Sequence, residues 1–141
     1  MEKQIRQWQK FDEMYEVDNS TDRPPFGKYV VEVKDICLKS SKKGEPMIYI
    51  WFKIDDSISQ INDDINENIF YNQVIIGGKQ RKIAMSIIRM LLKPFDLDIY
   101  FNSYEELGRT IMEYSELIKQ RKYVLEFNQS ERGNLTYRIE L

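Results

Sequence analysis

Residues 40–54 read SSKKGEPMIYIWFKI, a basic polar turn that leads directly into a strand with aromatic side chains. Residues 39–45 contain three lysines, two serines and a glycine, which favours a solvated turn that attracts phosphates. One face of the expected strand is apolar and suited to burial: Ile48, Ile50, Phe52 and Ile54. The opposite face carries rings and a terminal cation: Met47, Tyr49, Trp51 and Lys53. Such a face suits stacking of single-stranded nucleic acid, although a sheet covered on both sides has the same pattern.

The composition is that of an ordinary folded domain. The chain has 141 residues, 42% of them hydrophobic and 31% charged, so residues 1–141 are expected to form one domain. No apolar run approaches the about 20 residues of a membrane span, and the first residues, MEKQIRQWQK, lack the apolar core of a secretory signal. The single cysteine, Cys37, cannot form an internal disulfide. The sequence therefore predicts a protein of a reducing cytoplasm without membrane contact.

Charge is segregated along the chain. The net charge of -2 disfavours binding of duplex DNA by bulk positive charge, so any nucleic-acid site must come from local clusters. Three short basic clusters are present: Lys39, Lys42 and Lys43; Lys79, Arg81 and Lys82; Lys119, Arg121 and Lys122. Residues 55–67 contain acidic residues and no bases. Short charge runs of this kind are also typical of solvated surface.

The periodicity predicts a leading amphipathic helix within residues 1–17, a linker over 18–26, and a main body over 27–141. In the main body, strands are expected over 28–38, 47–54 and 68–76, with a polar loop over 57–67. Gly77 and Gly78 end the third strand, and a core-facing helix then runs to Pro94. A second helix begins at Ser103, where Glu106 completes a capping box. Two strand-like segments, 122–128 and 135–141, form a terminal hairpin.

This order of elements predicts a mainly β fold with helices. The OB-fold has this order, with three strands, a helical insertion and two further strands. It is a five-stranded barrel that binds oligonucleotides on the face of strands two and three. An SH3-like barrel or an α+β sandwich uses similar elements. Trp8 of the leading helix fits two roles, a plug at one barrel end or an additional stacking ring, and the first is favoured.

The sequence resembles small phage-encoded single-stranded-DNA-binding proteins with an OB-fold. The resemblance rests on the leading segment with Phe11, the PPFGKY entry at 24–29, the SKKGEPM run at 41–47, the aromatic strand after it, and the helical insertion before a terminal hairpin. It implies sequence-tolerant binding of displaced single strands and their handover to replication or recombination proteins in a bacterial host cytoplasm. Some single-strand binders recruit partners through a flexible acidic tail. Residues 136–141 here have strand character, so the resemblance does not imply recruitment of that kind.

On the barrel interpretation, the candidate nucleic-acid-binding residues fall into three groups. Tyr49 and Trp51 are the expected stacking platforms, and Tyr71 with its neighbour Asn72 is expected to extend the surface. Lys42, Lys43 and Lys53 are expected to contact phosphates. In the last hairpin, Arg138 points away from Tyr137, so we expect Arg132 and Arg138 at the site and Tyr137 in the core.

Catalysis is not expected. The absence of histidine excludes His-based triads and most zinc sites, and one cysteine excludes cysteine-rich knuckles, so no metal or cofactor is predicted. Gly77-Gly78-Lys79 lacks the first glycine and the Ser or Thr of a P-loop. The acidic pairs Asp55-Asp56 and Asp63-Asp64 are better explained as solvated surface than as a two-metal nuclease site.

The second hypothesis is a protein-interaction module on the same fold, without useful DNA affinity, in which the aromatic face contacts a protein. The net acidity and the acidic stretch 55–67 favour it. The oligomeric state is open, since the leading helix can pair with a neighbouring copy or pack on its own barrel.

Overall fold

The first three strands form an antiparallel meander, as the sequence predicts. The structure is a computed structural model and describes residues 23–55 and 67–140. β1 (Gly27–Ser40) pairs with β2 (Pro46–Ile54), and β2 pairs with β3 (Asn68–Val74). The predicted leading helix with Trp8, and the loop that carries Asp56, Asp63 and Asp64, lie outside the described residues.

Helices separate this meander from a terminal hairpin. The insertion consists of α2 (Gly78–Leu92), a short 3-10 helix η2 (Lys93–Phe95) and α3 (Tyr104–Lys119). β4 (Lys122–Gln129) and β5 (Leu135–Glu140) then form an antiparallel hairpin. All five strands belong to one sheet in the order β3-β2-β1-β4-β5. The prediction of a mainly β, barrel-like fold with a helical insertion between strands three and four is confirmed.

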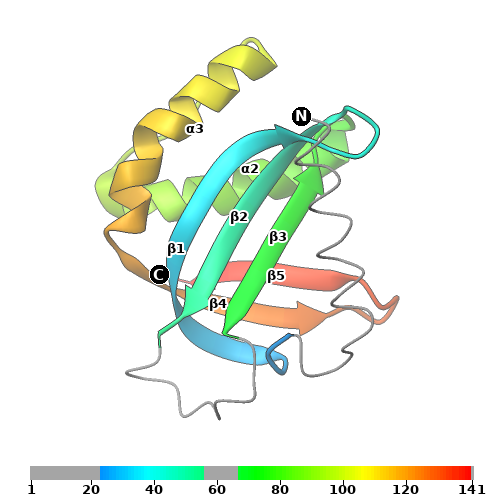
Figure 1. The fold of residues 1–141 in the computed structure, drawn as a ribbon, viewed down its shortest axis with the longest axis vertical. Helices are drawn as coiled ribbons and strands as arrows, with labels where there is room; N and C mark the ends of the chain where they lie inside the picture. The colour runs from blue at the N-terminus through cyan, green and yellow to red at the C-terminus, as the bar shows by residue number, and fades with distance from the viewer. Residues whose placement is uncertain (1–22, 56–66, 141) are drawn as a thin grey trace.

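β1 joins the two halves of the sheet. Its first residues, from Gly27 to Glu32, pair with β4, whereas the part from Val31 to Ser40 pairs with β2. The register with β2 shifts between Val33 and Asp35, and such a bulge bends a strand and increases its twist. Figure 1 shows β1 curving from the β4–β5 hairpin to β2 and β3, so that the hairpin runs across the direction of the meander. The bent β1 therefore gives the sheet its barrel-like shape.

Aromatic side chains connect the two edge strands, β3 and β5. The Tyr137 hydroxyl on β5 donates a hydrogen bond to the backbone carbonyl of Phe70 on β3, at 2.9 Å. The Tyr137 ring also meets Tyr71 edge-on, with ring centroids 4.9 Å apart, and lies 5.5 Å from the ring of Phe127 on β4. We call this contact between the two edges the aromatic seam. These ring contacts and the hydrogen bond to the Phe70 backbone hold the two edges of the sheet together.

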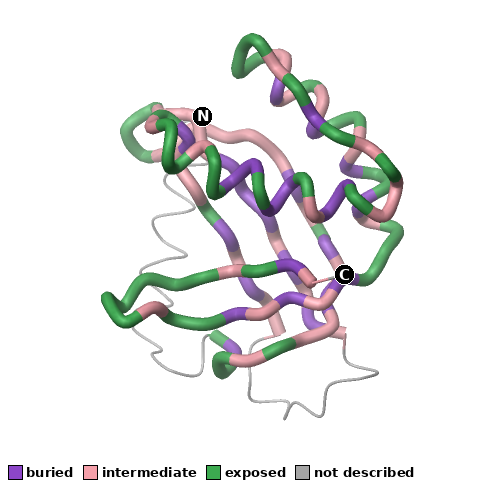
Figure 2. Tube along the Cα trace, turned by 180° about the vertical axis from the view of Figure 1, so that it is seen from behind, coloured by how far each residue is buried: buried purple, intermediate pink, exposed green. Residues whose placement is uncertain are grey.

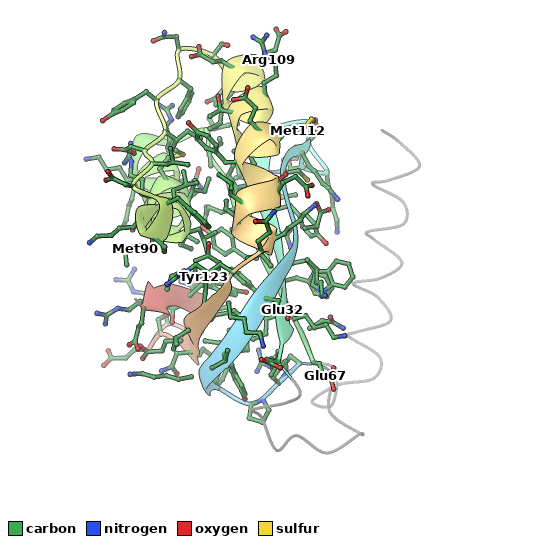
Figure 3. All side chains as sticks on the ribbon, turned by 90° about the vertical axis from the view of Figure 1, so that its left-hand side faces the viewer. Glu32, Glu67, Met90, Arg109, Met112 and Tyr123 are labelled. Carbon is green, nitrogen blue, oxygen red and sulfur yellow. The ribbon has the colours of Figure 1, made fainter. Side chains whose placement is uncertain are left out.

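The core lies between the concave side of the sheet and the helices. Ile48, Ile50 and Phe52 are 0% exposed and Ile54 is 1% exposed, which confirms the predicted apolar face of β2. α3 runs along β1 (Figure 3), close enough that a methyl group on Gly108 would meet Leu38 at 3.6 Å. The Tyr123 hydroxyl of β4 donates to the Leu91 carbonyl of α2 at 2.8 Å. Figure 2 shows that burial is concentrated where sheet and helices meet, while the tip of the β4–β5 hairpin is exposed.

The predicted start of the second helix is also confirmed, with one difference in its cap. The Ser103 hydroxyl accepts a hydrogen bond from the Glu106 amide at 3.1 Å. The Glu106 carboxylate accepts from the Asn102 amide, one residue before the position of a standard capping box. None of the helices among the described residues is both long and apolar enough to cross a membrane.

The aromatic seam makes a measurable contribution to stability. Tyr137→Phe keeps the ring contacts but removes the hydrogen bond to Phe70, so we expect the free energy of unfolding to fall by about 1 kcal/mol. Urea denaturation followed by circular dichroism measures this. Tyr100→Phe is the matched control, since its hydroxyl bonds Asp98 at 3.1 Å on a side chain that is 77% exposed, and we expect a change below about 0.5 kcal/mol. Equal effects of the two substitutions would contradict the role given to the seam.

Candidate functional site

The convex side of β1, β2 and β3 is the surface on which the predicted aromatic residues meet. Residues directly opposite each other in an antiparallel sheet point to the same side, so the register defines this surface in rows. Four rows cross the three strands: Glu32, Lys53 and Asn68; Asp35, Trp51 and Phe70; Cys37, Tyr49 and Asn72; Lys39, Met47 and Val74. We call these positions the outer face.

Three rings form a continuous strip across the middle rows of the outer face. The Phe70 ring lies 6.0 Å from that of Trp51, with an interplanar angle of 28°. It lies 6.3 Å from the ring of Tyr49, at 20°. Trp51 and Phe70 are both half-buried. We call Tyr49, Trp51 and Phe70 the aromatic strip.

Trp51 is held in a defined orientation. Its indole Nε1 donates to the Asn68 side-chain oxygen at 2.7 Å, across the β2–β3 pair. Lys53 stands directly opposite Asn68, at the end of the outer face. Trp51 and Lys53 therefore occupy the positions predicted for them, on the convex side of β2.

Tyr49 lies on the predicted side of β2, but the prediction of an accessible stacking platform is wrong. Its ring is only 4% exposed. The Lys39 ammonium group lies 4.0 Å from the ring centroid, a cation–π contact, and Phe70 stacks against the ring. Burial raises the pKa of the Tyr49 hydroxyl, and the nearby charges of Asp35 and Cys37 raise it further. Tyr49 thus supports the strip from within instead of presenting a ring to a ligand.

Tyr71 is not part of the outer face, so the prediction that it extends this surface is wrong. It pairs with Ile50, a core residue of β2, and is 3% exposed. The adjacent residue Phe70 pairs with Trp51 and takes the outward position that was assigned to Tyr71. Asn72 does face outward and is exposed, as predicted. The polar residues Asn68 and Asn72 indicate which side of β3 faces solvent. Because residues two apart share a face, Phe70 lies on that side with them.

The basic turn caps one end of the outer face. The Ser41 amide donates to the Glu45 carbonyl at 2.7 Å, and Gly44 adopts a positive φ of 81°. The Ser41 hydroxyl accepts from the backbone amides of Lys43 and Glu45, which leaves a compact turn. Lys42 and Lys43 are both exposed in it. Two cations therefore stand beyond the row that contains Lys39, at the opposite end of the face from Lys53.

Arg132 and Arg138 belong to the other arm of the bent sheet. Arg138 is exposed on β5 opposite Glu126, while Tyr137 points to the core side, as predicted. Arg132 is exposed in the turn between β4 and β5. Both are surface cations, but neither lies in the rows of the outer face. The structure therefore groups the lysines with Trp51 and places the two arginines on a separate element.

Acidic and cysteine side chains are the remaining groups that could hold a metal. Within residues 23–55 and 67–140, no three His, Cys, Asp or Glu side chains gather as metal ligands would. Asp55 of the first acidic pair forms an ion pair with Lys122 at 2.6 Å. This contact raises the pKa of Lys122 and ties the end of β2 to the start of β4.

Comparison with known proteins adds no family. No protein-family model matches the chain, and a search of curated proteins found no significant match.

Cys37 in the outer face gives a direct test of how well this surface is packed. Burial raises the pKa of its thiol to about 11, although the charge of Lys39 partly offsets the effect. Because the thiolate is the reactive form, we expect alkylation by iodoacetamide at pH 8 to be about 100-fold slower in the folded protein than in urea. The rate should then rise with pH up to about 11.

The raised pKa of Cys37 also determines how its contribution to stability changes with pH. The folded-state pKa lies above the unfolded value, so the contribution of the thiol to stability is complete at neutral pH and is lost as the pH rises toward 11.

Mass spectrometry of quenched time points measures the rate of Cys37 alkylation. Alkylation at pH 8 that is as fast in the folded protein as in urea would contradict the buried environment of Cys37.

Proposed function

We propose that the protein is a non-catalytic single-stranded-DNA-binding protein that acts in phage or prophage replication or recombination. The observation that carries the proposal is the half-buried pair Trp51 and Phe70 on the convex side of β2 and β3, with lysines at both ends of the same face. This is the side on which OB-fold barrels bind oligonucleotides.

Each part of the outer face has a physical role in this function. Bases stack on the accessible surfaces of Trp51 and Phe70, an interaction that every base can make. The hydrogen bond from Trp51 to Asn68 holds the indole, so less rotamer freedom is lost on binding. Lys42 and Lys43 at one end and Lys53 at the other attract phosphates.

The preference for single strands follows from charge and shape. Duplex DNA conceals the faces of its bases, so an aromatic strip gains nothing from it. A duplex binder needs an extended basic surface, whereas this chain has a net charge of -2 and local clusters only. The proposed place of action is the bacterial host cytoplasm, with replication or recombination proteins as further partners.

A second candidate function is a protein-interaction module, and one observation favours it. The outer face also carries two carboxylates, Glu32 and Asp35, next to Lys53 and Trp51. Carboxylates repel phosphates, while aromatic residues such as Trp51 are frequent hot spots in protein interfaces. This alternative predicts no measurable affinity for any oligonucleotide at low salt.

The stacking role is tested with Trp51→Ala. We expect binding of a labelled thymine oligonucleotide of about 30 nucleotides to weaken about tenfold, because one base loses its platform. Fluorescence anisotropy at low and moderate salt, with duplex DNA as competitor, measures the affinity, and circular dichroism checks the fold. Tyr100→Ala is the control, an aromatic residue that is 77% exposed but outside the outer face. Undiminished binding by a folded Trp51→Ala variant would mean that the assigned face is wrong.

The basic turn is tested through the salt dependence. Replacing Lys42 and Lys43 by Gln removes two phosphate contacts, so we expect the slope of log affinity against log salt to fall by about 1.4. The same titration at four salt concentrations measures the slope. A double change of Arg132 and Arg138 to Gln is the charge-matched comparison. A larger effect of the arginine pair would place the phosphate path on the β4–β5 hairpin instead.

A further inference from the structure

Asp35 occupies an unexpected position for a surface that attracts nucleic acid. It stands directly opposite Trp51 in the β1–β2 register, immediately after the bulge. Side chains in such opposed pairs have Cβ atoms about 5 Å apart. The carboxylate acts on its neighbours, since its charge raises the pKa of both Cys37 and Tyr49. Among the described residues, none of the ion pairs involves Asp35.

The two sides of Trp51 differ in chemistry. Phe70 lies on one side of it, with its ring 6.0 Å away, and Asp35 lies on the other. The Nε1 edge of the indole is already engaged with Asn68. A base stacked on Trp51 therefore meets a ring toward β3 and a carboxylate toward β1. Charge repulsion disfavours a phosphate beside Asp35, so a base edge is the part of a nucleic acid better suited to this position.

We infer that Asp35 makes the outer face select guanine at the position stacked on Trp51. The inference rests on the proposed function and specifies its ligand. A carboxylate only accepts hydrogen bonds, through two adjacent oxygens. The Watson–Crick edge of guanine offers two adjacent donors, N1–H and the N2 amino group, which match these oxygens in a bidentate contact.

The other bases fit the carboxylate less well. Cytosine and adenine each offer one amino group, at N4 and N6, beside a ring nitrogen that accepts. Thymine presents a single N–H between two carbonyl oxygens, and these oxygens are repelled by the carboxylate. The expected order of affinity therefore places guanine first and thymine last. A good bidentate contact corresponds to about a tenfold difference in affinity or more.

The experiment uses the complete chain and three labelled probes of equal length. The first is a thymine oligonucleotide, and the second carries 7-deazaguanine at every third position, which keeps the Watson–Crick edge and prevents quadruplex formation. The third carries 7-deazainosine at those positions, called the inosine probe, and lacks only the N2 amino group. Anisotropy titrations at one moderate salt concentration give the three affinities. We expect the deazaguanine probe to bind about tenfold tighter than the thymine probe, and the inosine probe to fall between them.

Two variants separate recognition of the guanine base from the effect of charge on affinity and from an effect on folding. Asp35→Asn keeps the shape but loses one acceptor and the charge, so the guanine preference should drop below about twofold while thymine binding is unchanged or tighter. Glu32→Gln removes the same charge from the next row of the outer face, opposite Lys53. This substitution should increase the affinity for all three probes equally and keep the preference for guanine. If Asp35 had only a structural role, the Asp35→Asn variant would lose affinity for all three probes to the same extent.

The outcomes are distinct. A guanine preference that is lost in Asp35→Asn and kept in Glu32→Gln supports the inference. Equal binding of the three probes by the parent protein overturns it and leaves the proposed single-strand function standing. A preference that survives Asp35→Asn also overturns it. Absence of binding to every probe overturns the proposed function together with the inference.

Discussion

The pairing of one strand with two partners is the constraint on which the rest of this molecule depends. Residues 27–32 of β1 pair with β4 and residues 31–40 pair with β2. The register with β2 shifts between Val33 and Asp35, just beyond the last residue that pairs with β4. A straight strand would hold all five strands in an open sheet, whereas the bent β1 turns the terminal hairpin across the meander (Figure 1). The concave side then encloses a core, and the convex side presents the outer face.

Much of this fold is readable from the sequence, because the relevant signals are local. The alternation from Ile48 to Ile54 fixed which side of β2 is buried, and Ser103 with Glu106 marked the start of α3. The basic turn at Lys42 and Lys43 is likewise where the polar residues placed it. These features depend on neighbours in the chain, so a single sequence contains the information.

The two errors have different origins, one in a local alternation and one in contacts between distant segments. The prediction places Tyr71 on the outer face, but Asn68 and Asn72 occupy that face and Tyr71 lies between their positions in the alternation. Tyr71 pairs with Ile50 and faces the core. Tyr49 faces outward, yet Lys39 and Phe70 cover its ring. No local pattern reports such coverage, because it depends on which rings the register places side by side. The aromatic strip is consequently narrower at its accessible surface than its composition indicates.

The aromatic seam has a consequence for motion. Phe70 contributes its carbonyl oxygen to the seam and its ring to the outer face, so one residue belongs to both sides of β3. We expect a displacement of the Phe70 ring to shift the backbone carbonyl that Tyr137 holds, and a loss of this hydrogen bond to free the ring in turn. If the proposed function holds, we expect occupancy of the outer face and closure of the barrel to be thermodynamically linked through Phe70. On the proposed function, the contact between β3 and β5 would then influence how the outer face meets its ligand.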